Sequence, residues 1–142
     1  MSQSEQPSVA HRAVLADALR LVREQAARAE EDPDAVPLAE VIDSPFGLGY
    51  LFGAVDALCQ GHGAAFDGMA LAVYALALDA ALDREADDVR DRALDLHESD
   101  DPTFARGRQW GGNEAMGWKA GQHEPVGLLH LARGDEGRMG AQ

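Results

Sequence analysis

Four aspartates recur at every fourth position in the most acidic part of the chain. They are Asp83, Asp87, Asp91 and Asp95, within a stretch, 83–101, in which nine of nineteen residues are acidic. On an α-helix this spacing places the carboxylates on one ridge, about 6 Å apart, because residues i and i+4 are surface neighbours. Such a ridge could bind a basic protein surface, and an inhibitor that mimics the phosphates of DNA would use a similar spacing. The alternative interpretation is a solvated helix face without a partner.

Both tryptophans lie in a glycine-rich, locally basic segment, 106–119. Arginine and tryptophan beside flexible backbone can hold an anion or an aromatic ligand, which an amide and a carboxylate would orient. The candidate pocket residues are Trp110, Asn113, Glu114 and Trp118. In a second interpretation the two tryptophans simply pack onto the core. The glycines match neither the phosphate-loop nor the dinucleotide-binding spacing, so no nucleotide cofactor is predicted.

The other reactive side chains form no catalytic or metal-binding motif. The five histidines lack the H-x-x-x-H spacing, and the single cysteine cannot complete a zinc site with them, so a metal site would require assembly from distant parts of the chain. Cys59 lies in an apolar stretch, which indicates a buried thiol, and no G-x-S-x-G segment is present. Catalytic residues are therefore unknown, no cofactor or metal is expected, and we favour a non-enzymatic protein.

The composition limits the class of partner. The 142 residues include 25 acidic and 12 basic side chains, which gives a formal net charge of −13. Nucleic acids and anionic lipid surfaces would be repelled, so we expect neither nucleic-acid nor membrane binding, whereas a basic protein surface would be attracted. The acidity could equally serve solubility or reflect genome composition or a saline habitat. With one cysteine and no apolar leader, the sequence predicts a cytoplasmic protein, and homo-oligomers are compatible with it.

The spacing of apolar residues predicts helices and no strand. A first helix is expected over 9–30 with Ser8 as its N-cap, followed by one short helical turn over 37–42. A helix over 46–59 is followed by one over 66–82 that is apolar on almost every side. An all-round apolar helix of this length is typical of the centre of a bundle.

Three more helices complete the prediction. The acidic segment 83–97 is expected to form one of them. The next starts at Pro102 and should be bent or interrupted before residue 120, because five glycines weaken it. The last follows Pro125 and ends at Gly134.

The predicted fold class is all-α. We expect a single-domain bundle of six to seven helices over residues 1–142, with the helix at 66–82 in its centre. The two ends, 1–7 and 135–142, are expected to fray, and no linker or internal repeat divides the chain.

Small residues recur at every fourth position on two of these helices. Side chains of this size let helix backbones approach closely, so we predict a close helix crossing at each stripe. The alternative is chance in a chain rich in alanine and glycine. The stripes are Gly49, Gly53 and Ala57 on one helix and Gly107, Gly111 and Ala115 on the other.

Three functions fit these patterns. The leading hypothesis is a small acidic protein-interaction module, of the inhibitor, immunity or adaptor type, that binds a basic protein surface. The alternative is a small-molecule-binding or enzymatic domain with a site near Trp110–Trp118 that could also use His62. A third, weaker hypothesis is a helical hairpin over 46–82 that inserts into membranes when acid neutralises its carboxylates, although its apolar part is short for a span of about 20 residues.

Overall fold

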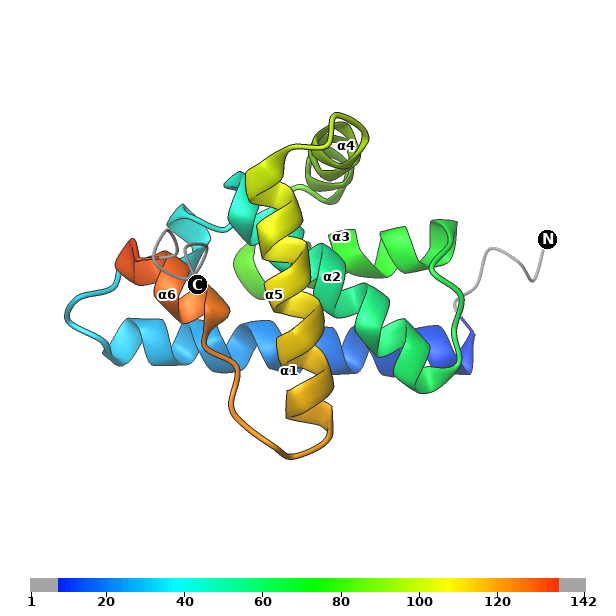
Figure 1. Cartoon of the computed structure of the whole chain (residues 1–142), viewed down its shortest axis with the longest axis horizontal. Helices are drawn as coiled ribbons and strands as arrows, with labels where there is room; N and C mark the ends of the chain where they lie inside the picture. Colours follow the sequence, from blue (N-terminus) through cyan, green and yellow to red (C-terminus); the bar gives the residue numbers. More distant parts are fainter. Residues whose placement is uncertain (1–7, 136–142) are drawn as a thin grey trace.

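Six α-helices and one 3₁₀ turn make up the regular structure of residues 8–135, the part of the chain that the computed structural model describes (Figure 1). In chain order they are α1 (Val9–Glu31), the 3₁₀ turn η2 (Leu38–Glu40), α2 (Pro45–His62), α3 (Gly68–Leu82), α4 (Ala86–Glu98), α5 (Pro102–Lys119) and α6 (Gly127–Arg133). No strand occurs within 8–135, and the predicted all-α bundle is confirmed. The fraying predicted for 1–7 and 135–142 lies outside the described residues except at Asp135, whose backbone N–H donates to the His130 carbonyl at 3.0 Å.

Side chains cap the N-termini of several helices, and Ser8 caps α1 as predicted. The side chains of Ser8, Ser44, Asp67 and Asp101 each accept a backbone N–H from the first turn of the helix that follows. Proline is the first residue of α2 and of α5. An N–H group at this position has no hydrogen-bond partner within the helix, so proline, which lacks it, fits there without loss. α6 ends at Gly134, whose φ of 78° is a left-handed conformation that glycine adopts without strain. These boundaries therefore depend on local sequence.

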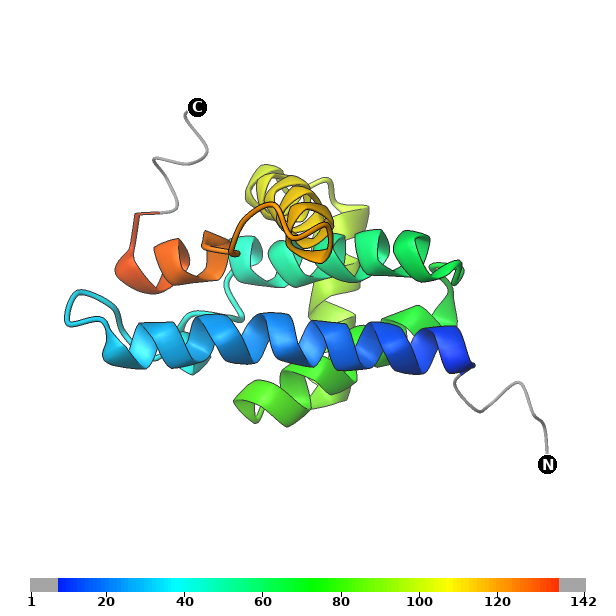
Figure 2. The same ribbon diagram turned by 90° about the horizontal axis from the view of Figure 1, so that it is seen from below.

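The helix at the centre of the bundle is α2. Twelve of its eighteen residues are buried, and it contacts the other five α-helices. Figure 2 shows α3 and α5 on opposite sides of the α1–α2 pair. α3 packs mainly on α1, and Leu76 on its outer face is 48% exposed, so the predicted central position of 66–82 is corrected. Its alanine-rich sequence is apolar on every side, a pattern that does not reveal which side meets solvent.

The small residues of α2 and α5 meet each other. A Cβ atom added to any of four glycines would lie 1.8–2.2 Å from a backbone oxygen of the opposite helix, closer than any side chain can approach. The four are Gly49, Gly53, Gly107 and Gly111. The predicted close crossing is therefore confirmed, and Figure 1 shows α5 passing across α2. The sequence predicted that α5 would be bent or interrupted. The interruption is wrong, since Pro102–Lys119 form one continuous helix whose Gly107 and Gly111 face α2.

The proposed membrane hairpin, 46–82, forms α2 and α3. No helix in the described part of the chain combines the length and the apolarity that crossing a membrane requires. Tyr74 of α3 is buried and donates its hydroxyl to the Leu48 carbonyl of α2 at 2.9 Å. Burial also raises the pKa of this phenol well above its ordinary value. The two helices are therefore joined by a specific buried hydrogen bond as well as by apolar packing.

Candidate functional site

The four residues predicted to form a ligand pocket all lie on α5. Trp110, Glu114 and Trp118 occur at four-residue steps and share one face of the helix, whereas Asn113 is exposed. Both tryptophans are partly buried against the core, and the Arg20 guanidinium lies 4.6 Å from the centre of the Trp118 ring. None of the four lines the pocket described below. This arrangement agrees with the packing interpretation.

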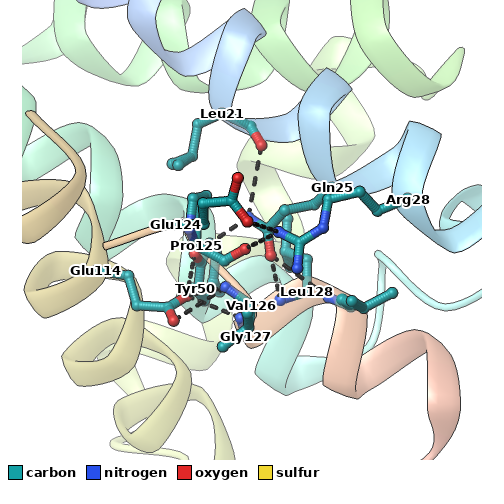
Figure 3. A network of polar contacts seen from close by, with 11 residues as sticks. Leu21, Gln25, Arg28, Tyr50, Glu114, Glu124, Pro125, Val126, Gly127 and Leu128 are labelled. Atoms are coloured by element: carbon teal, nitrogen blue, oxygen red, sulfur yellow. Dashed lines mark hydrogen bonds and ion pairs between the residues drawn. The ribbon is translucent and has the colours of Figure 1, made fainter. Parts of the chain in front are cut away.

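Glu114 is the centre of a buried polar network (Figure 3). Its carboxylate accepts the Tyr50 hydroxyl at 2.5 Å and the backbone N–H groups of Val126 and Gly127 at 2.8–3.1 Å. The first N–H groups of a helix have no partner within it and carry partial positive charge, which a carboxylate satisfies. Glu114 therefore fixes the start of α6 against α5 and α2.

Gln25 of α1 extends this network. Its amide N–H donates to the Tyr50 oxygen at 3.1 Å, and its side-chain oxygen accepts the Leu128 N–H at 2.8 Å. Burial raises the pKa of Tyr50 well above its ordinary value, and the charge of Glu114 adds to the effect, so the phenol remains a donor. Because each of these contacts joins one helix to another, the network holds α1, α2, α5 and α6 together and is structural.

α4 carries three of the four aspartates of the predicted ridge. Asp87, Asp91 and Asp95 are exposed on it. Asp83 ends α3 in a left-handed conformation with φ of 57°, and Glu85 is the N-cap of α4. The prediction of four carboxylates on one helix is therefore corrected to three, because the i, i+4 pattern continues across a helix boundary.

The charge of this face is only partly neutralised. The Arg90 guanidinium lies 3.5 Å from the Asp87 carboxylate and 3.4 Å from that of Asp91. Exposed pairs of this kind contribute about 0–1 kcal/mol each, so they can be exchanged for contacts with a partner. With five acidic and two basic residues, α4 has a net charge of −3.

A second polar cluster lies where the C-terminal ends of α2 and α5 approach α1. The Oδ2 atom of Asp17 is 2.7 Å from His62 Nε2 and 3.0 Å from Lys119 Nζ. Burial acts to raise the pKa of Asp17, but the hydrogen bonds from His62 and Lys119, together with their charges, leave it below its ordinary value. Asp17 is therefore ionised at neutral pH and fixes the positions of the other two side chains.

His62 and Lys119 line an open pocket of about 440 Å³ between the ends of α2 and α5. This volume is within the range of about 300–1,000 Å³ that is common for small-molecule sites. The described residues around the pocket include no Asp or Glu, and Lys119 is the only lysine of the chain. The other lining residues are Ala57, Leu58, Gln60, Gly61, Ala115, Met116 and Ala120. The pocket is thus mainly apolar, with a cation and an imidazole at one part of its wall.

The sequence prediction missed this site because its three polar residues lie far apart in the chain. His62 follows Asp17 by 45 residues, and Lys119 lies on yet another helix. One signal was present, since Asp17 falls on the buried face of α1, between Val14 and Leu21. An acidic residue on an apolar face needs a partner, which here is supplied by two other helices.

The Cys59 thiol is buried in α2. Burial raises the pKa of the Cys59 thiol to about 11, so the thiol is protonated at neutral pH and is a weak nucleophile. Within residues 8–135, no three His, Cys, Asp or Glu side chains converge as ligands of one metal ion.

No protein-family model, curated protein or solved structure matches the chain. Its function must therefore be inferred from the described residues themselves.

Proposed function

We propose that the protein is a small, non-enzymatic interaction module that binds a basic protein surface through the acidic face of α4. The observation that carries this proposal is the exposed series Asp87, Asp91 and Asp95 on a helix of net charge −3. Inhibitor, immunity and adaptor proteins act by such contacts. Complementary charge would raise the rate of association and select the partner more than it would raise affinity.

The position of α4 supports this use. It lies at the edge of the bundle (Figure 1), and its buried residues are Val89 and Ala93. Substitutions of the exposed aspartates, which point away from the core, therefore leave the core contacts of Val89 and Ala93 unchanged. The net charge of −13 for the whole chain adds long-range attraction to a basic partner.

The test compares two double charge reversals. Asp87→Lys with Asp91→Lys alters the α4 face, and Glu30→Lys with Glu31→Lys makes the same change in net charge at exposed positions of α1. Partners would be captured from the native cell with the wild-type protein, and their dissociation constants measured for all three proteins at several salt concentrations.

We expect the α4 reversal to weaken binding at least about tenfold and to flatten its salt dependence, because charge pairs across the interface are lost. The α1 reversal should have a much smaller effect. Equal losses in the two variants would indicate a net-charge effect without a specific face, and a partner that is indifferent to the α4 reversal would contradict the proposal.

A further inference from the structure

We infer that the pocket between the C-terminal ends of α2 and α5 binds a small aliphatic carboxylate. Its carboxylate would contact Lys119 and His62, and its chain would lie along the apolar wall. α4 contributes no residue to this pocket, so the inference is independent of the proposed partner binding.

The size and lining of the pocket indicate the chain length. A water molecule has about 30 Å³ of liquid volume, so 440 Å³ has room for on the order of a dozen non-hydrogen atoms. A fatty acid of about ten carbons has this size. Leu58, Ala57 and Ala115 form apolar wall, and Met116, 62% exposed, is a flexible apolar side chain at the same pocket. Leu58 and Ala115 are themselves buried, so the apolar surface that an aliphatic chain would remove from water belongs chiefly to Met116 and to the half-buried Ala57.

The polar groups indicate the charge of the ligand. The Lys119 ammonium has three N–H donors, of which the contact with Asp17 at 3.0 Å uses one. Asp17 is 7% exposed and is not a lining residue, so it lies behind the two groups that face the pocket. No acidic side chain is among the described lining residues, and two N–H donors of Lys119 are left for an anionic head group, although the ionised Asp17 behind them offsets part of the ammonium charge. A cationic head group would meet no carboxylate among the described lining residues.

Asp17 acts as a positioning residue in this site. Its single Oδ2 atom receives both His62 and Lys119, which come from the last turns of two different helices. The ammonium group is therefore held near the imidazole, although both side chains are partly exposed and would otherwise be mobile. Such pre-organisation lowers the entropy cost of ordering a long lysine side chain on binding.

Decanoate is the probe for this inference, and decan-1-ol, with the same chain and no charge, is its control. Because the chain has one lysine, protein labelled with ¹³C-lysine gives a single set of side-chain signals. We expect decanoate to shift these signals with saturation and a Kd of about 1 mM or below, as is usual for a ligand of roughly a dozen atoms. Decan-1-ol should bind at least about fivefold more weakly.

Three variants locate the site, with binding followed by backbone amide signals. Lys119→Gln should weaken decanoate at least about tenfold and leave decan-1-ol almost unchanged. Ala120→Trp, at an exposed lining position, should fill the pocket and abolish binding of both probes. Arg23→Gln makes the same change in charge at an exposed position of α1 outside the pocket and should bind like wild type.

Three results would overturn the inference. They are the absence of saturable shifts with decanoate, equal affinity for decanoate and decan-1-ol, and wild-type decanoate affinity in Ala120→Trp. The tryptophan variant retains Lys119 and Asp17, so it tests the site even where Lys119→Gln alters stability.

Discussion

Gly53→Ala should destabilise the protein by forcing α2 and α5 apart. The added Cβ atom would lie 1.9 Å from the Arg108 backbone oxygen, and Cβ atoms essentially never approach another heavy atom within 3.0 Å. The two backbones must therefore separate locally by at least 1.1 Å, the difference between these two distances. Both contacting groups belong to helices, so neither can move aside as a flexible side chain would.

The size of the effect follows from two opposing contributions. Overpacking of a close-packed interior costs about 1–3 kcal/mol and occasionally more, and a clash with backbone belongs at the upper end. Replacing glycine by alanine within a helix recovers about 1 kcal/mol through helix propensity. We therefore expect a net loss of about 2 kcal/mol in the free energy of unfolding, and a fall of roughly 6–10 °C in Tm for a chain of this size.

Gly61→Ala is the matched control. Gly61 also lies within α2, but no atom approaches the position of its added Cβ within 4 Å. This variant should gain up to about 1 kcal/mol from helix propensity, so the two substitutions are expected to have opposite signs. Urea unfolding and thermal melts followed by circular dichroism measure both. A Gly53→Ala protein as stable as Gly61→Ala would refute the close crossing.

Two further predictions concern the polar clusters. Glu114→Gln should lower the free energy of unfolding by about 2–3 kcal/mol, because the Tyr50 hydroxyl and the first N–H groups of α6 lose their charged acceptor. The control is Glu124→Gln, which makes the same substitution at an exposed position. Equal effects of the two substitutions in urea unfolding would contradict the structural role of the network. The lowered pKa of Asp17 means that its ionised form stabilises the fold above about pH 4 and that this contribution is lost as the pH falls through the folded-state pKa. Asp17→Asn should therefore flatten the acid side of the curve of stability against pH, whereas an unchanged slope below about pH 4 would show that Asp17 is not coupled to folding.

Helix boundaries were predictable where the determining groups are local. Ser8, Ser44 and Asp67 each lie within three residues of the N–H groups that they accept, so the cap is visible in the sequence itself. The start of α4 was not predictable in this way. Asp83 adopts a left-handed conformation without glycine or proline to mark the break, and the charge pattern continues past it.

The arrangement of the helices was less predictable than their existence. The apolar sequence of α3 suggested a central position. The helix instead lies at one side of the bundle, and apolar side chains such as Leu76 are on its exposed outer face. The stripe of Gly49 and Gly53 predicted a close approach, but its partner is determined by tertiary packing. Similarly, Glu114 was selected as a pocket residue and instead caps α6, because the spacing of residues on α5 does not show which other segments reach them.

The close crossing also accounts for the pocket. Gly53 and Gly111 hold α2 and α5 at minimal separation, and two helices that cross at an angle diverge beyond their point of contact. The next residues of the same stripes, Ala57 and Ala115, line the pocket, and their small side chains leave the widening space unfilled. One pattern of small residues therefore determines both the packing of the central helix pair and the concave surface at its end. It follows that a substitution at the crossing acts on the pocket as well, so the decanoate measurement is informative only in proteins that retain the glycines of both stripes.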